Sequence, residues 1–319
     1  MVDGVIIIDK PTGWTSHDVV ARVRRILGER RVGHTGTLDP FATGVLVMLT
    51  GRATRLAQFV SGAEKEYEAV IRFGYATDTG DATGEPRVGP QAGLRVEESL
   101  MAWSDAEIEW ALRALRGRIE QVPPMYSAKK VKGRKLYEMA RRGEEVERAP
   151  VPVIVHEFEA TRVDDVLLRR NEDGTRDLSV RVVCSAGTYI RALAESVGER
   201  LGVAAHLAAL RRTRAGRFKI EDATGLDQLR EMAEQGLEAG VLLPPDAALS
   251  EMPFAHLTAE EARGARHGMA LRMDAPLGEK YPDGQHIKMF DESGNLLAVG
   301  IYDALTGELR PRVVLALEK

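Results

Sequence analysis

Residues 33–44 read Gly-His-Thr-Gly-Thr-Leu-Asp-Pro-Phe-Ala-Thr-Gly, a short stretch in which one carboxylate, Asp39, stands among small residues and turn formers. Asp-Pro is a common turn dipeptide, so the plainest interpretation of Asp39 is a loop residue that caps its own backbone. The neighbouring residues indicate more, because they place many backbone donors and the ring of His34 around a single acid. Asp39 is therefore the candidate catalytic residue.

The segments on either side of this stretch predict regular structure. Residues 5–8 form an apolar, β-branched run that predicts a buried strand. Residues 16–27 place apolar side chains on one helical face, with Ser16 as the expected cap and Gly28 as the expected stop. Residues 44–49 are equally compatible with a strand and with a buried helix, because a continuous apolar run has no distinguishing period.

Two longer strands and a helix are predicted farther along the chain. Apolar and polar residues alternate over residues 67–73 and again over 178–185, which is the period of a half-buried strand. The second strand contains Cys184, the one cysteine of the chain, so no internal disulfide is possible and a buried position is expected. A helix should follow, with Thr188 as its cap and Arg191 in its first turn.

These blocks resemble the TruB family of pseudouridine synthases, the bacterial enzymes that isomerise uridine 55 in the T arm of tRNA. The stretch around Asp39 is similar to the family's Asp-containing motif, and further blocks match in the same order, at residues 4–16, 65–70, 74–81, 121–128, 187–191 and 205–212. The resemblance implies an α+β fold with a mixed, largely antiparallel sheet flanked by helices, followed by a small C-terminal PUA-like β-barrel.

The same resemblance implies two domains. Residues 1–248 would form the catalytic domain, and residues 249–319 a PUA-like domain that binds RNA. The prolines at residues 244 and 245 mark the boundary, and the short strands beyond them suit a small barrel. Residues 125–150 are expected to be an insertion that clamps RNA and is mobile without it, because this basic segment has no evident apolar face.

The catalytic set expected by resemblance is Asp39, Tyr67 and Arg191. Asp39 would either attack C1′ of the sugar or take a proton from C2′, and the sequence leaves both routes open. Arg191 would keep Asp39 ionised, and its place in a first helical turn supports this, since a cation there opposes the helix dipole. Tyr67 would lie against the flipped base and help to remove the C5 proton.

A second set is expected to contact the RNA or the flipped nucleotide. His34 would fill the stacking gap that the flipped base leaves, and Tyr189 and Leu210 would line the pocket. Six basic residues would also bind the RNA or the substrate; these are Lys10, Lys129, Lys130, Lys132, Arg211 and Arg212.

The distribution of charge supports a polyanionic partner although the net charge is −4. Residues 22–31, 125–142 and 206–220 carry net charges of +4, +6 and +5, a total of +15, which leaves −19 for the rest of the chain. A defined basic surface on an acidic protein favours specific RNA binding. For residues 22–31, a solvated helix face explains the arginines equally well.

Composition and motifs narrow the other possibilities. The chain has 319 residues, 44% of them hydrophobic and 29% charged, without an apolar run of membrane-spanning length or a signal core, so a cytoplasmic protein is expected. Glycine-rich nucleotide motifs and zinc-site spacings are absent from the sequence, so we expect no cofactor and no metal. A monomer without an obligatory protein partner is the default expectation.

Two competing functions remain to be compared with RNA isomerisation. A non-catalytic RNA-binding module would explain the basic segments but would leave Asp39, Tyr67 and Arg191 without a purpose. A carboxylate-dependent glycosidase needs a second acid near the first, and the sequence shows no such partner around Asp39.

Overall fold

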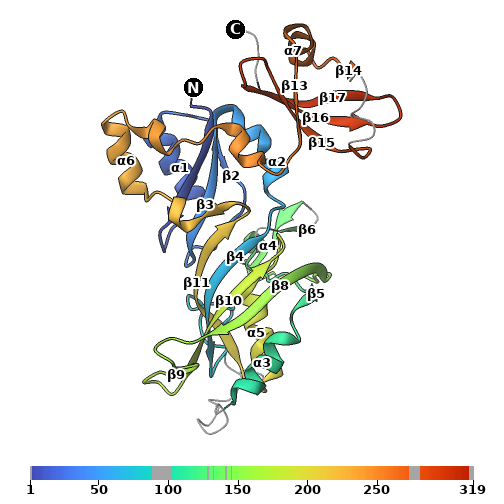
Figure 1. The fold of residues 1–319 in the computed structure, drawn as a ribbon. Helices are drawn as coiled ribbons and strands as arrows, with labels where there is room; N and C mark the ends of the chain where they lie inside the picture. The colour runs from blue at the N-terminus through green and yellow to red at the C-terminus, as the bar shows by residue number, and fades with distance from the viewer. Residues whose placement is uncertain are drawn as a thin grey trace.

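The computed structural model describes residues 2–87, 103–127, 129–131, 133–140, 142–144, 146–272 and 281–315. Within these residues the chain forms a ten-stranded sheet with helices packed on it and a separate five-stranded sheet near the C-terminus (Figure 1). None of the described helices is long and apolar enough to cross a membrane.

The large sheet has the strand order β1-β3-β11-β4-β10-β8-β5, with β2, β9 and β12 paired at its margins. All of its pairings are antiparallel except the pairing of β11 with β3. The predicted mixed, largely antiparallel sheet is therefore confirmed. Its strands are β1 (Gly4–Lys10), β2 (Val32–His34), β3 (Thr43–Thr50), β4 (Lys65–Phe73), β5 (Gly117–Gln121), β8 (Val151–Thr161), β9 (Leu168–Arg170), β10 (Arg176–Cys184), β11 (Ala205–Ala215) and β12 (Phe218–Lys219).

Helices pack on this sheet and on one another. α5 packs on β11 and β4, α3 contacts α5 and β8, and α1 packs against α6 (Figure 1). The helices are α1 (Ser16–Leu27), α2 (Ala57–Val60), α3 (Asp105–Arg113), α4 (Leu136–Ala140), α5 (Ile190–Arg200), α6 (Leu226–Glu234) and α7 (Ala259–Arg266). Short 3-10 turns complete the set, namely η1 (Gly51–Leu56), η3 (Ile220–Asp222), η4 (Glu238–Val241) and η5 (Pro245–Leu249).

The helix ends confirm some of the predicted caps and correct others. Thr15, one residue before Ser16, caps α1 and forms a capping box with Asp18, while Gly28 ends the helix with φ of +61° as predicted. Tyr189 precedes α5 at the cap position, so Thr188 is not the cap, although Arg191 does lie in the first turn.

The ambiguous run of residues 44–49 is a strand with both faces buried. On β3, Leu46 and Met48 pack in the cluster that contains α1, whereas Val45 and Val47 pack in the cluster that faces the C-terminal sheet. A strand covered on both sides reads as a continuous apolar run, which is why its sequence shows no alternation. Cys184 is buried at the end of β10, as expected.

The C-terminal sheet has the order β13-β15-β16-β17-β14 and carries α7 on one side, which is consistent with a PUA-like domain. Its strands are β13 (Phe254–His256), β14 (Leu271–Arg272), β15 (His286–Phe290), β16 (Leu296–Asp303) and β17 (Glu308–Val314). Val299 and Val313 share a core cluster with Val5, Val47 and Leu249 of the preceding residues. The division after residue 248 stays a prediction.

The basic insertion contains a short hairpin, formed by β6 (Lys130–Val131) and β7 (Arg134–Lys135), that leads into α4. Leu136 and Met139 of α4 are buried. The expectation that this segment has no apolar face is therefore wrong, because two side chains one helical turn apart do hold it down. Its expected mobility stays a prediction.

Candidate active site

A cavity of about 230 Å³ opens where the Asp39 loop, β4, β11 and the start of α5 meet. Six of the residues expected from the sequence lie in its wall: Asp39, Tyr67, Tyr189, Arg191, Leu210 and Arg212. They come from positions as far apart as 39 and 212, and the pairing of β11 with both β4 and β3 brings them together.

Asp39 and Arg191 form an ion pair at two points. Nε of Arg191 lies 2.9 Å from Oδ2 of Asp39, and Nη2 of Arg191 donates to Oδ1 at 3.2 Å. The guanidinium is fixed by two backbone carbonyls as well, that of Thr79 at 2.8 Å and that of Tyr126 at 2.6 Å. Asp39 thus faces the cavity with its carboxylate oriented by a planar, nearly immobile cation.

Asp81 is a second acid at this arginine, and sequence reasoning gave it no role. Its Oδ2 lies 3.7 Å from Nη1 of Arg191, while its Oδ1 accepts bonds from the Thr79 hydroxyl at 2.9 Å and from the Thr83 hydroxyl at 2.6 Å. Asp81 is buried and is not part of the cavity wall. Asp81 therefore contacts Arg191 outside the cavity wall and helps to hold the guanidinium in place. The signal in the sequence is the matched block at residues 74–81, which by itself does not indicate a partner of Arg191.

The pKa of Asp39 is raised above its ordinary value. Burial is the largest cause, and the nearby charge of Asp81 acts in the same direction. Arg191 and Lys10 lower the pKa of Asp39 but do not cancel the effect of burial, although the side chain retains 32% exposure. The expectation that Arg191 favours the ionised form is right in sign, but the carboxylate is more basic than an ordinary aspartate.

Tyr67 extends from β4 into the cavity and is largely buried. Burial raises the pKa of its phenol, and Arg212 opposes that rise through its charge and a side-chain hydrogen bond. The two residues are directly paired across β4 and β11. Tyr67 is therefore a protonated phenol at neutral pH with a cation beside its polar end.

Tyr189 is held in the cavity wall through its backbone. Its N–H donates to Oε1 of Gln121 at 3.0 Å, and Nε2 of Gln121 donates to the carbonyl of Tyr189 at 3.3 Å. The amide side chain of Gln121 therefore fixes the backbone of Tyr189 directly before α5. Gln121 belongs to a matched sequence block, but its role as this clamp was not predicted.

Lys10 is not a candidate for RNA contact in this structure. Its side chain is 0% exposed, and Nζ donates to the carbonyls of Pro11 at 3.0 Å, Trp14 at 2.6 Å and Pro40 at 3.1 Å. Burial lowers the pKa of Lys10 to about 8. The lysine therefore braces the Asp39 loop against the turn after β1. Because its ammonium is buried, the predicted direct binding of RNA by Lys10 is corrected.

The basic window at residues 206–220 is mostly structural. Arg212 is 2% exposed, Arg214 pairs with Glu64 at 2.6 Å, and Arg217 lies over the ring of Phe218 at 5.9 Å. Arg211 is partly exposed but pairs with Asp9 at 2.8 Å. Arg217 and Lys219 are the exposed cations of this window. Arg212 lies in the cavity wall, and its role in binding RNA or substrate stays a prediction.

His34 and Lys129 are not part of this cavity's wall. The ring of His34 packs edge-on against that of His17, with centroids 5.7 Å apart, and burial lowers the pKa of His34 to about 4. The neutral ring can stack without charge. Lys129 is half-buried at the start of the basic hairpin. The side chain of Lys130 and all of Lys132 lie outside the described residues.

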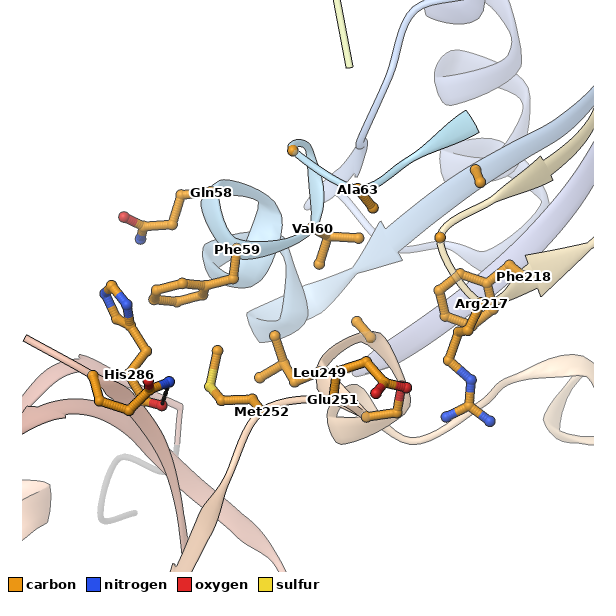
Figure 2. A pocket seen from close by; sticks show the side chains of 16 residues that line it. Gln58, Phe59, Val60, Ala63, Arg217, Phe218, Leu249, Glu251, Met252 and His286 are labelled. Atoms are coloured by element: carbon orange, nitrogen blue, oxygen red, sulfur yellow. Dashed lines mark hydrogen bonds between the residues drawn. The ribbon is translucent and has the colours of Figure 1, made fainter. Parts of the chain in front are cut away.

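A larger cavity of about 760 Å³ separates α2 and η5 from β15 of the C-terminal sheet. Figure 2 shows Phe59 pointing toward His286, with Met252 and Leu249 below them. The rings of Phe59 and His286 meet edge to face at 5.0 Å. None of the sequence-predicted site residues lies in this wall. The described residues contain no cluster of acids, histidines and cysteines suited to a metal ion.

Comparisons with known proteins agree with this geometry. Residues 24–190 match the model described as TruB family pseudouridylate synthase (N terminal domain), and residues 191–250 match the tRNA pseudouridylate synthase B C-terminal domain. The chain is similar to the tRNA pseudouridine synthase B of Thermobifida fusca (strain YX), with 45% identity over 99% of each chain. The corresponding protein of Geobacillus thermodenitrificans (strain NG80-2) is 44% identical, over 87% of this chain and 88% of the relative.

A solved structure shares the fold over nearly the whole chain. A crystal structure of a Cbf5-Nop10-Gar1 complex superimposes with a TM-score of 0.71 and 26% identity, covering 98% of this chain and 85% of the other. The two matched segments both contribute to the cavity, because Asp39 lies in the first segment and its ion-pair partner Arg191 in the second. The chain belongs to the TruB family of pseudouridylate synthases.

Proposed function

We propose that the protein isomerises uridine 55 in the T arm of tRNA to pseudouridine, using Asp39, Tyr67 and Arg191. The observation that carries the proposal is the two-point ion pair of Asp39 and Arg191 in the wall of a cavity that also contains Tyr67. A base in a folded arm must leave its stack to react, and a small cavity with flat and apolar walls can receive it. Tyr67, Tyr189 and Leu210 provide such walls.

The carboxylate of Asp39 can assist the reaction by two routes. It can attack C1′ as the C1′–N1 bond breaks, or it can take the proton from C2′ and give a glycal. The raised pKa of Asp39 suits both routes, since a more basic carboxylate is also a better nucleophile. After the base turns, C5 joins C1′ as Asp39 leaves C1′ or returns its proton to C2′. The C5 proton then passes to the phenolate form of Tyr67 and N1 takes up a proton from water, so the reaction begins and ends without a change of oxidation state.

A glycosidase acting on free sugars fits the geometry less well. Asp81 does supply a second carboxylate near Asp39, but it is buried behind Arg191 and is not exposed in the cavity wall. A second catalytic acid must reach the leaving group or a water. We expect tRNA as the substrate and a monomer as the working form, and the protein can have a further role as a binder that helps tRNA to fold.

The proposal is tested by incubating the purified protein with an unmodified tRNA transcript that carries labelled uridine and locating any pseudouridine. We expect one product at position 55 and none in a transcript that has cytidine there. Modification at another position would replace the proposed specificity, and absence of pseudouridine from an intact tRNA would overturn the proposed function.

A further inference from the structure

Arg212 is a buried cation without a carboxylate partner among the described residues. Its side chain is 2% exposed, whereas the ion pairs on the same strand are made by Arg211 with Asp9 and by Arg214 with Glu64. Burying a cation without an opposite charge costs several kcal/mol of folding free energy unless hydrogen bonds compensate. A buried cation of this kind therefore indicates a functional role that outweighs the loss of folding stability.

Two backbone carbonyls hold the guanidinium of Arg212 in one orientation. Nε donates to the carbonyl of Val45 on β3 at 2.7 Å, and Nη2 donates to the carbonyl of Gly36 in the Asp39 loop at 3.0 Å. Both acceptors are neutral, so the positive charge is oriented but not neutralised. Gly36 itself lies in the cavity wall, which places the charged end of Arg212 at the cavity.

Tyr67 lies directly across from Arg212. The two residues are register partners on β4 and β11, and both contribute to the cavity wall. Directly opposite side chains on one face of a sheet are close enough to interact. We propose that Arg212 is a positioning residue for the reaction: it holds the phenol of Tyr67 in the cavity and stabilises negative charge on the phenolic oxygen while the C5 proton is removed.

This inference rests on the proposed function, because it needs Tyr67 to receive that proton. The resting phenol first loses its proton to water through the cavity, and the adjacent guanidinium stabilises the phenolate that forms. The C5–H bond then breaks, its electrons return to the base, and the proton goes to the phenolate oxygen, which restores the phenol. N1 of the base takes back from water the proton that the phenol released. Protons and electrons balance, and Arg212 itself transfers nothing.

The other ionisable groups near Tyr67 do not replace Arg212. Lys65 also lies in the cavity wall, but its Nζ donates to the carbonyl of Ser61 at 2.8 Å. Asp39 and Cys184 both disfavour a phenolate and raise the pKa of Tyr67. Arg212 is the cation that opposes them, both by its charge and by side-chain hydrogen bonding.

The test separates a role in turnover from a role in binding. We expect Arg212→Gln to lower kcat at saturating tRNA by about a hundredfold with KM changed less than about threefold, since the residue acts on a reacting group and not on RNA phosphates. Arg212→Lys should recover part of the loss because it keeps the charge. Arg214→Gln is the matched control on the same strand, and its kcat should equal that of the wild type.

A double-mutant cycle with Tyr67→Phe makes the inference falsifiable even if Arg212→Gln folds poorly. If Arg212 acts through Tyr67, Arg212→Lys should cause no further loss of kcat in the Tyr67→Phe protein. Fluorotyrosine placed at position 67 and followed by ¹⁹F NMR should titrate at higher pH in Arg212→Gln than in Arg212→Lys, an effect that a purely structural role would not produce.

Three outcomes would overturn the inference. These are additive losses in the cycle, an unchanged titration of residue 67, and an increase of KM at constant kcat, which would return Arg212 to phosphate binding. Failure of the proposed function is distinguishable, because the wild-type protein would then make no pseudouridine at all.

Discussion

The cavity at Asp39 and the cavity beside the C-terminal sheet differ in size and in chemistry, and the smaller one is the candidate site. The cavity of about 230 Å³ contains Asp39, Arg191 and Arg212, and its walls come from one continuous sheet and its loops. The cavity of about 760 Å³ is lined by side chains such as Phe59, Leu249 and Met252, at the junction with the C-terminal sheet. Volume alone would have selected the wrong one.

Buried charged side chains therefore identify the functional site better than cavity volume does. Burying Arg191 and Arg212 lowers the stability of the fold, and the structure retains both. Backbone carbonyls fix both guanidinium groups, and Arg191 is also held by the carboxylate of Asp39. The larger cavity contains contacts of the kind that any two packed layers make. Substitutions in each cavity separately test this contrast.

The largest effect should come from Asp39→Asn, which keeps the shape of the side chain and removes its charge. We expect isomerisation to fall by at least about a thousandfold while tRNA binding stays within about tenfold, because the variant loses the reacting group and not the docking surface. Single-turnover formation of pseudouridine measures the loss, and a binding titration provides the control. Turnover by an uncontaminated preparation would remove Asp39 from the reaction.

Arg191→Lys should have the next largest effect, a loss of about a hundredfold in kcat. Lysine keeps the charge but cannot bridge both oxygens of Asp39 while it also donates to the carbonyls of Thr79 and Tyr126. Arg169→Lys is the matched control, at an exposed arginine of β9 that pairs with the buried Asp177 of β10. Wild-type turnover in Arg191→Lys would show that the planar fork is unnecessary.

The pH dependence of kcat should show the raised pKa of Asp39. The ionised carboxylate of Asp39 reacts, and burial raises the pKa of Asp39 above that of an ordinary aspartate. As pH decreases below this raised pKa, kcat should fall by about tenfold per pH unit. The measurement is kcat at saturating tRNA across the range in which the fold is intact by circular dichroism. A decline only near the ordinary carboxyl pKa would contradict the effect of burial.

A smaller effect is expected at the basic hairpin. Replacing Lys129, Lys130 and Lys132 together with Gln should raise KM for tRNA severalfold and leave kcat unchanged, because these residues position the substrate. The dependence of binding on salt should flatten by about 0.7 to 0.9 log units per log unit of salt for each phosphate that the variant no longer neutralises. An unchanged salt dependence would leave phosphate binding to other basic residues.

The smallest effect on activity should come from the larger cavity. Phe59→Ala removes the edge contact with His286 and should lower the free energy of unfolding by about 1 to 2 kcal/mol, with kcat within about twofold of the wild type. Urea denaturation measures the first quantity. Phe254→Ala, at a ring that is 55% exposed, is the matched control and should lose less. A large loss of kcat would mean that this cavity serves the reaction.

Local patterns predicted much of the secondary structure. The helix over residues 16–27 ends at Gly28 as predicted, because a helix stop depends only on the residues next to it. The alternating strand at residues 67–73 is half-buried as its period indicated. Residues 44–49 could not be assigned, since burial on two faces removes the alternation.

The sequence by itself determined the family, the residues of its motifs and the candidate pair of Asp39 and Arg191. Only the tertiary structure decided what the other polar residues do: Asp81 and Gln121 support the site, Lys10 braces a loop, and Arg212 faces Tyr67. The physical reason is that a charged residue looks the same in sequence whether it is exposed or buried. Its partners lie on strands and loops far away along the chain, and their packing sets its solvation, its pKa and therefore its role.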